Sequence, residues 1–219
     1  MKGARHSAVA LVPALLVALG ACTPWTTRPI GWQDGSAASS AQSPTAYADS
    51  IWAAKLVPAV LGSAVDARTL LDALAASPAE ARARYGRQQA GGAMFFIVKG
   101  RGLVAAVDTR SGNGLALVDV ATYDGRPDVS IQIGPVLRGT ALRDAPGLVH
   151  FTDFVNQLQF AEVANALNER VLKTVLAPLG AVALKGRVVW YAGALEADGS
   201  GGPPLAGLVP IQLTVEESR

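Results

Sequence analysis

Cysteine and histidine are scarce in this chain of 219 residues, which has one cysteine, Cys22, and two histidines. A single thiol excludes a disulfide within the chain. Thiol catalysis and zinc sites built from cysteine and histidine are also largely excluded, because they need residue types that are almost absent. We therefore expect no cofactor, no metal site and no catalytic residue.

The sequence also lacks a hydrophobic run long enough to span a bilayer, which takes about 20 apolar residues. The apolar stretch of residues 8–19 is shorter, is interrupted by Pro13 and leads into Leu-Gly-Ala-Cys at residues 19–22. A basic start, a short apolar run and a small residue before the cleavage site, which precedes the cysteine, are typical of a bacterial lipoprotein signal. We expect residues 1–21 to be a signal peptide and Cys22 to carry the lipid.

Charge of one sign is not in excess once the signal peptide is removed. The full chain has 19 basic and 17 acidic residues, and residues 1–21 contain Lys2 and Arg5 but no acid, which leaves 17 of each. A neutral chain argues against nucleic acid as a partner, and acyl chains on Cys22 must then hold the protein to the membrane. Thr23 stands where an aspartate would favour the inner membrane, so the outer membrane is the expected location.

Residues 22–45 are rich in proline, glycine, serine and alanine, which indicates a flexible tether after the lipidated cysteine. Residues 46–92 are expected to form helices that pack on the rest of the chain, the first of them interrupted by Pro58. Asp66 is the expected N-cap of the second helix. The dipeptide Ser77-Pro78 is typical of the start of a third.

After residue 92 the hydrophobic period becomes that of strands. Residues 94–98 and 103–107 predict either a hairpin or one long strand bent at glycines. Two more strands are expected at 115–120 and 129–133, where Ser130 and Gln132 alternate with apolar residues. A helix of about 20 residues, capped near Thr152 or Asp153, is expected next and is apolar on more than one side. The last two strands are expected at 188–194 and 209–215.

Three strands, a helix and two strands, in that order, match an OB-like five-stranded barrel. We expect this barrel over residues 93–219, with the helix between strands 3 and 4 closing its bottom. The predicted fold class is mainly β with helices (α+β). A mixed α+β sandwich is the alternative, because strand order cannot be read from one sequence.

Sequence motifs of hydrolases, phosphate-binding loops and calcium loops are absent from the chain. His150 lies three residues before Asp153, but a single histidine before a helix is more often a capping or surface group. Asp119, Asp124 and Asp128 could together chelate a hard cation. We favour the other interpretation, in which turn aspartates accept hydrogen bonds from their own backbone.

The best candidate for ligand recognition is the loop of residues 134–144. Arg138, Arg143 and Asp144 concentrate charge there, and an arginine can bind a carboxylate through two parallel hydrogen bonds. Gln132, just before the loop, completes this candidate set. The alternative, which we prefer, is an internal ion pair of Arg138 or Arg143 with Asp144 that fixes the entry into the helix.

Polar and aromatic residues in the second half of the chain add two further hypotheses. Asparagine has poor helix propensity, so four amides in the long helix indicate hydrogen bonds to loops or a subunit contact: Asn156, Gln157, Asn165 and Asn168. On the fourth strand, Trp190 and Tyr191 could stack a sugar or a base. Adjacent strand residues face opposite sides, so only one of the two can be external.

Six segments of the chain form a recognisable pattern: residues 47–52, 98–100, 107–109, 131–144, 153–157 and 163–168. The pattern covers nearly the whole chain after Cys22 and resembles that of the predicted bacterial periplasmic lipoproteins grouped as domain of unknown function 2291. The resemblance implies an OB-like fold and a periplasmic location. It also implies a link to sugar-type ABC import systems, whose genes often lie beside those of the family.

These observations predict a lipid-anchored periplasmic protein that is not an enzyme and that binds or organises an envelope component. ABC transporter components for sugar uptake are the partners that the resemblance implies. The alternative is a small-ligand-binding OB domain that recognises sugars or sugar acids through the loop that contains Arg138, Arg143 and Asp144. The sequence leaves a homo-oligomer open.

Overall fold

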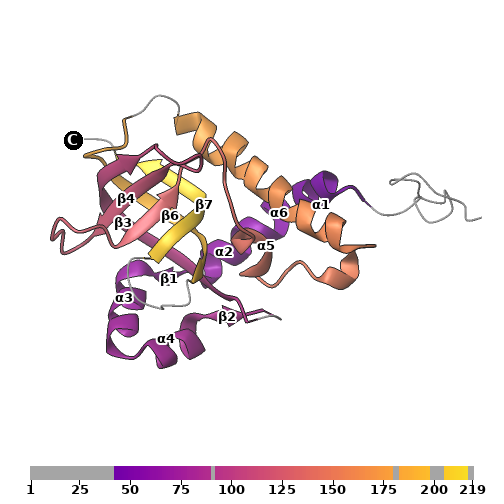
Figure 1. Cartoon of the computed structure of the whole chain (residues 1–219), viewed down its shortest axis with the longest axis horizontal. Helices are drawn as coiled ribbons and strands as arrows, with labels where there is room; N and C mark the ends of the chain where they lie inside the picture. The colour runs from indigo at the N-terminus through magenta and orange to yellow at the C-terminus, as the bar shows by residue number, and fades with distance from the viewer. Residues whose placement is uncertain (1–41, 90–91, 180–182, 198–204, 217–219) are drawn as a thin grey trace, which may run out of the picture. The chain divides into compact units, whose positions relative to one another are not determined.

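A closed ring of five strands organises the fold. The computed structural model describes residues 42–89, 92–179, 183–197 and 205–216. Within them, β3 (Met94–Asp108), β4 (Leu115–Val120) and β5 (Val129–Gln132) form an antiparallel meander. β7 (Leu205–Val215) pairs parallel with β5 and antiparallel with β6 (Val188–Ala197), and β6 returns to β3 (Figure 1). The expected signal peptide at 1–21, Cys22 and all of the expected tether except residues 42–45 lie outside the described residues.

β3 is one long strand, as one of the two sequence interpretations predicts. Its residues from Met94 to Leu103 pair with β6, and those from Gly102 to Asp108 pair with β4. The strand thus passes from one neighbour to the other along its length, and this makes closure of the ring possible. A Cβ atom at Gly102 would lie 2.6 Å from the carbonyl oxygen of Asp119, so this crossing requires glycine.

The helices expected over residues 46–92 are present, although the first begins at Pro44, inside the segment expected to be a tether. α1 (Pro44–Ile51) continues through a π-helical turn, Trp52–Leu56, into α2 (Val57–Ser63), so the interruption at Pro58 is a change of helix type rather than a break. Asp66 caps α3 (Ala67–Ala76) by accepting a hydrogen bond from the backbone N–H of Thr69 at 3.2 Å. α4 (Pro78–Tyr85) begins after Ser77 as predicted, although the Ser77 side chain makes no capping hydrogen bond.

Two hydrophobic clusters hold these elements together within one compact unit, residues 40–219. One cluster fills the interior of the ring and includes the apolar side of α3, so that Leu70 and Leu74 are buried in the same cluster as Val98 and Val118. The two-residue strands β1 (Val65–Asp66) and β2 (Arg87–Gln88), which pair with β3, flank this region. The other cluster lies between the ring and a layer formed by α1, α2, α5 (Ala141–Asp144) and α6 (Gln157–Val171).

The long helix begins later than predicted. Its N-cap is Asn156, whose side-chain oxygen accepts a hydrogen bond from the backbone N–H of Gln159 at 2.9 Å. Thr152 and Asp153, the predicted caps, belong instead to a short 3-10 turn, Phe151–Asp153, followed by extended backbone at Phe154. The prediction was wrong because several residues here can cap a helix, and the packing of Phe154 on Tyr47 of α1, with ring centroids 5.0 Å apart, selects the later one.

The position of this helix also differs from the expectation that it closes the bottom of the ring. The buried residues of α6, Val163, Leu167 and Val171 among them, pack in the outer cluster with α1 and α5. The π-helical turn that follows, Leu172–Leu176, and the 3-10 turn Ala177–Leu179 bring Val175, Leu176 and Leu179 against the interior cluster. The end of the helix, and not its body, therefore covers this part of the ring.

Strand β5 is buried on both faces, which the alternating pattern does not predict. Ser130 is 7% exposed and Gln132 is 4% exposed. Both are polar because they bind backbone groups of neighbouring segments. The Ser130 hydroxyl accepts a hydrogen bond from the backbone N–H of Gly207 at 2.8 Å, and the Gln132 amide donates to the carbonyl oxygen of the same glycine at 2.9 Å. A polar residue in the middle of a sheet can thus be a buried partner of the backbone rather than a solvent-facing one.

Candidate functional site

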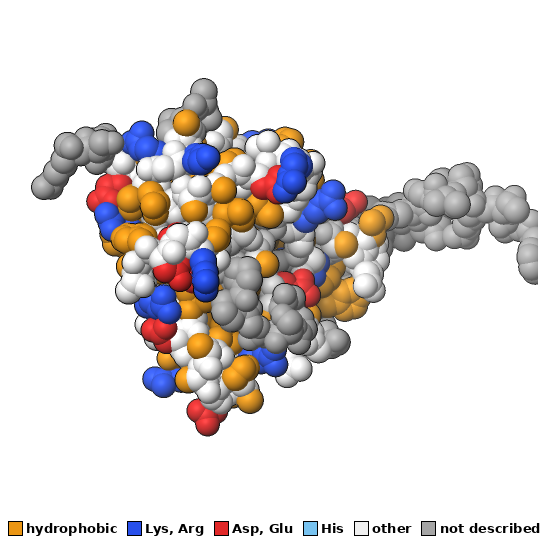
Figure 2. Space-filling model, turned by 60° about the vertical axis from the view of Figure 1, so that its left-hand side comes forward, with side chains coloured by type: hydrophobic (Ala, Val, Ile, Leu, Met, Phe, Trp, Pro, Cys, Tyr) orange, Lys and Arg blue, Asp and Glu red, His pale blue; other side chains and the backbone are white. Residues whose placement is uncertain are grey.

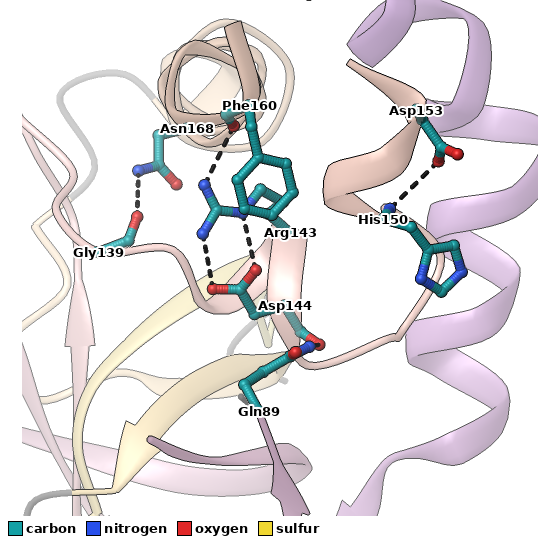
Figure 3. Close-up of polar contacts among 8 residues, drawn as sticks. All are labelled: Gln89, Gly139, Arg143, Asp144, His150, Asp153, Phe160 and Asn168. Carbon is teal, nitrogen blue, oxygen red and sulfur yellow. Dashed lines mark hydrogen bonds and ion pairs between the residues drawn. The ribbon is translucent and has the colours of Figure 1, made fainter. Parts of the chain in front are cut away.

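Arg143 and Asp144, two of the candidate ligand-binding residues, bind each other in the interior. Arg143 Nε donates to Asp144 Oδ1 at 2.7 Å, and Nη2 donates to Oδ2 at 2.9 Å (Figure 3). The remaining nitrogen, Nη1, donates to the carbonyl oxygen of Phe160 at 3.0 Å, and the guanidinium lies 3.8 Å from the centre of the Phe160 ring. The pair ties α5 to α6, and the preferred internal ion pair is therefore the one observed.

Gln132 and Arg138 are joined through the backbone of the candidate loop. Gln132 Oε1 accepts a hydrogen bond from the backbone N–H of Arg138 at 2.8 Å, and Nε2 donates to the Arg138 carbonyl oxygen at 3.0 Å. The Gln132 amide therefore holds the loop against β5. Of the four candidate residues, Arg138 alone is exposed, so the structure does not bring the four side chains together around one site.

The residues considered for catalysis or metal binding bond mainly to the backbone. His150 is exposed, and its backbone N–H, rather than its ring, donates to Asp153 Oδ2 at 3.2 Å (Figure 3). Asp119, Asp124 and Asp128 accept hydrogen bonds from backbone N–H groups of their own hairpin, as the favoured interpretation predicts. Among the described residues, no three Asp, Glu, His or Cys side chains are placed to hold a metal ion.

A cavity of about 290 Å³ lies between the candidate loop and the helix. The loop contributes Val136 and the helix contributes Asn165, Asn168 and Glu169. Asn168 donates a hydrogen bond to the carbonyl oxygen of Gly139 at 3.0 Å, which fixes the loop over the helix (Figure 3). The expectation that an amide of this helix bonds to a loop is confirmed at Asn168. The cavity combines amide, carboxylate and apolar groups, which suits a small polar ligand.

A second cavity, of about 330 Å³, lies where the end of the helix meets the ring. It is apolar apart from one basic residue, and its lining is Val107, Ile133, Leu176, Leu179, Ala183, Leu184 and Lys185. The sequence does not reveal this cavity, because strand ends and a helix end from three separate parts of the chain form it.

An aromatic surface lies on the outside of the ring. Trp190 is 52% exposed while Tyr191 is 3% exposed, so one of the two faces outward as predicted. Arg101, which pairs with Trp190 across β3 and β6, places its guanidinium 5.9 Å from the centre of the Trp190 ring. Its Nη1 also donates to the hydroxyl of Tyr123 at 3.1 Å, and it forms an ion pair with Glu216. We call Arg101, Tyr123 and Trp190 the Trp190 surface.

Tyr191, on the opposite side of β6 from Trp190, points into the interior. Burial, together with the nearby carboxylates of Asp66 and Asp128, raises the pKa of its hydroxyl well above the ordinary value of 10.0. The hydroxyl has no hydrogen-bond partner among the described residues. Its position against Gly100 shows that it fills space at the crossing of β3 and β6 and takes no part in an exposed site.

The ring order β3-β4-β5-β7-β6, with the long helix α6 between β5 and β6 in the chain, is that of an OB-fold protein. The structure is similar to the crystal structure, at 1.90 Å resolution, of an OB-fold protein from Thermotoga maritima. The TM-score is 0.66 and the identity 22%, over 80% of this chain and 99% of that chain. At this identity the similarity concerns the fold alone.

The chain belongs to the family of predicted periplasmic lipoproteins, domain of unknown function 2291, whose sequence profile matches residues 12–214. The match covers most of the chain and establishes the predicted family. A comparison with curated proteins finds no match. In the part of the chain that the structure describes, no helix has the length and hydropathy to cross a membrane.

Proposed function

We propose that this periplasmic lipoprotein is a non-enzymatic accessory component of the envelope that is anchored by acyl chains on Cys22 and binds a partner protein through the Trp190 surface. ABC transporter components for sugar uptake are the proposed partners. The observation that carries the proposal is the grouping of the exposed side chains of Tyr123 and Trp190 around the half-buried Arg101, which contacts both. Tryptophan, tyrosine and arginine are the residue types that most often supply the binding energy of protein interfaces.

Contacts within the protein itself hold the side chains of the Trp190 surface. Glu216 holds the Arg101 guanidinium from one side, and the hydroxyl of Tyr123 accepts one of its hydrogen bonds. Side chains that are already fixed lose little conformational entropy on association. Basic and acidic side chains are interspersed on the face of the molecule that Figure 2 shows.

The test is sugar uptake by a strain that lacks the gene and is complemented with variants. We expect wild-type protein and Ser111→Ala to restore uptake, and Trp190→Ala to fail at equal protein abundance. Ser111 is the control because it is exposed and lies in the turn between β3 and β4, outside the Trp190 surface. A photocrosslinking residue at position 190 should capture a transporter subunit, and one at position 111 should not. Unchanged uptake of every sugar in the deletion strain would remove the transport link.

Anchoring and membrane choice are tested separately. Cys22→Ser should release the protein from membranes, because no polybasic segment replaces the acyl chains. We propose the outer membrane as the location, on the basis of Thr23, and expect Thr23→Asp to move the protein to inner-membrane fractions of a sucrose gradient. Wild-type protein in inner-membrane fractions would contradict this proposal.

A second candidate function, binding of a small sugar, rests on the cavity between the candidate loop and α6. The amides of Asn165 and Asn168 suit sugar hydroxyls, and the carboxylate of Glu169 favours neutral sugars over sugar acids. A neutral sugar that binds should raise the melting temperature of the wild-type protein. Asn165→Ala should abolish this rise while Trp190→Ala retains it, and a flat screen would leave the candidate without support.

A further inference from the structure

We propose that an apolar patch formed by Phe151, Val155 and Leu158 rests in the interfacial region of the membrane that holds the acyl chains of Cys22. These three side chains are 51%, 65% and 67% exposed, respectively. Single exposed apolar residues are ordinary on protein surfaces. Three large ones within eight consecutive residues form a group whose burial would be favourable.

The patch belongs to an ordered segment. Phe151 packs edge-on against Phe160, with ring centroids 5.7 Å apart. The backbone N–H of Val155 donates to the side chain of Gln159 at 3.3 Å, and the Asn156 cap fixes the first turn of α6, which contains Leu158. The side chains are therefore exposed although their backbone is held in place, so their exposure does not come from a loose loop.

The patch lies beside the helix through which the chain enters the fold. Phe154, next to Val155, packs on Tyr47 of α1, and α1 and α6 lie side by side (Figure 1). α1 begins at Pro44, 22 residues after Cys22. Even fully extended, 22 residues reach only about 75 Å, so anchoring keeps the start of α1, beside which the patch lies, within that distance of the bilayer. A domain that is tethered this close to the bilayer meets it at a high effective concentration, so weak apolar contacts are enough to orient the domain.

The charges around the patch indicate which part of the membrane it contacts. Residues 145–168 contain no lysine or arginine. Asp153 is exposed within the segment, and its carboxylate would be repelled by anionic headgroups. The contact is therefore apolar, with the boundary between headgroups and acyl chains, where amphipathic surfaces bind through buried apolar area. Three side chains also expose far less than the roughly 800 Å² per partner of a stable dimer, which argues against a second copy.

The experiment uses the lipidated protein in vesicles and one introduced thiol. Once Cys22 is acylated, Val155→Cys provides the only free cysteine, which is labelled with a dye whose emission shifts to shorter wavelength in apolar surroundings. Ser111→Cys, at an exposed position between β3 and β4, is the matched control. We expect the dye at position 155, and not at position 111, to shift and to be quenched by lipids that carry a nitroxide at the headgroup. The response should be the same within about twofold in zwitterionic vesicles with or without anionic lipid.

Three results would overturn the proposal. The dye at position 155 could remain as water-exposed as the dye at 111, or its shift could require anionic lipid. It could also shift in detergent without vesicles as the protein concentration rises, which would assign the patch to a second copy. A further variant, Leu158→Ser in the Val155→Cys protein, should reduce the quenching at least threefold with an unchanged melting temperature. Dye uptake by protein without an introduced cysteine would show that Cys22 is not acylated, which would contradict the anchoring and not the patch.

Discussion

Replacement of Asp144 by alanine should cost much of the stability of the fold. The change leaves Arg143 Nε and Nη2 without the carboxylate that now accepts from them at 2.7 and 2.9 Å. Arg143 is only 8% exposed, so water cannot readily take the place of the carboxylate. Removal of one partner of a buried ion pair costs about 3–5 kcal/mol, and the retained bond to Phe160 places the expected loss near the lower end, at about 3 kcal/mol.

The assay is equilibrium unfolding in urea, followed by tryptophan fluorescence. The double variant Arg143→Met, Asp144→Leu should be more stable than Asp144→Ala alone, because it removes both charges and keeps apolar volume against Phe160. Asp72→Ala is the matched control, since Asp72 forms an exposed pair with Arg68 in α3, and it should leave the unfolding midpoint unchanged within error. A loss below about 1 kcal/mol for Asp144→Ala would refute the structural role. It would also return Arg143 to the candidates for ligand binding.

Two further predictions concern the crossing of β3 with its neighbours. Gly102→Ala should destabilise the protein by about 1–3 kcal/mol, because the new Cβ meets Val118 and the backbone of Asp119. Gly62→Ala in α2, where no atom lies within 4 Å, should be neutral or stabilising in the same thermal melts, and equal losses would contradict the packing argument. Tyr191→Phe should lose no stability at pH 8, since the hydroxyl has no partner among the described residues. The folded-state pKa of Tyr191 is raised above 10.0, so the contribution of this neutral hydroxyl to the free energy of unfolding is fully present below pH 10 and is lost as the pH rises further. The phenylalanine variant should therefore lose less stability than the wild-type protein at alkaline pH. An identical alkaline loss in both proteins would rule out this explanation.

The parts of the fold that follow from local signals were predicted well. Asp66 caps α3 because its side chain has one nearby backbone N–H to bind, and strand β4 has the predicted bounds. The start of α6 was predicted wrongly because Thr152, Asp153 and Asn156 are all good caps. The choice among them depends on Phe154 packing against another helix, which no short window of sequence contains.

In the candidate site, too, contacts between neighbours in the chain could be predicted, while contacts between distant segments could not. The internal pairing of Arg143 with Asp144 could be anticipated because the two are neighbours in the chain. The Trp190 surface could not, since Arg101 meets Trp190 only through the register of β3 with β6. Strand alternation predicts that one of Trp190 and Tyr191 is exposed, but the identity of the residue that contacts Trp190 can be known only from the strand pairing. Gln132 was predicted to be a ligand-binding residue. Its burial could not be foreseen, because it depends on the path of residues 138 and 207.

The closure of the ring by β3 and β6 has a consequence for the route of the protein to the periplasm. Met94 pairs with Ala197 and Leu103 with Val188, so the ring cannot close until most of the chain has been synthesised. Pairing between such distant segments is slow, because the entropy of the intervening loop is lost before the contacts form. A chain that crosses the membrane unfolded can close this ring only after both β3 and β6 have crossed, so the fold then forms in the periplasm, the compartment of its family.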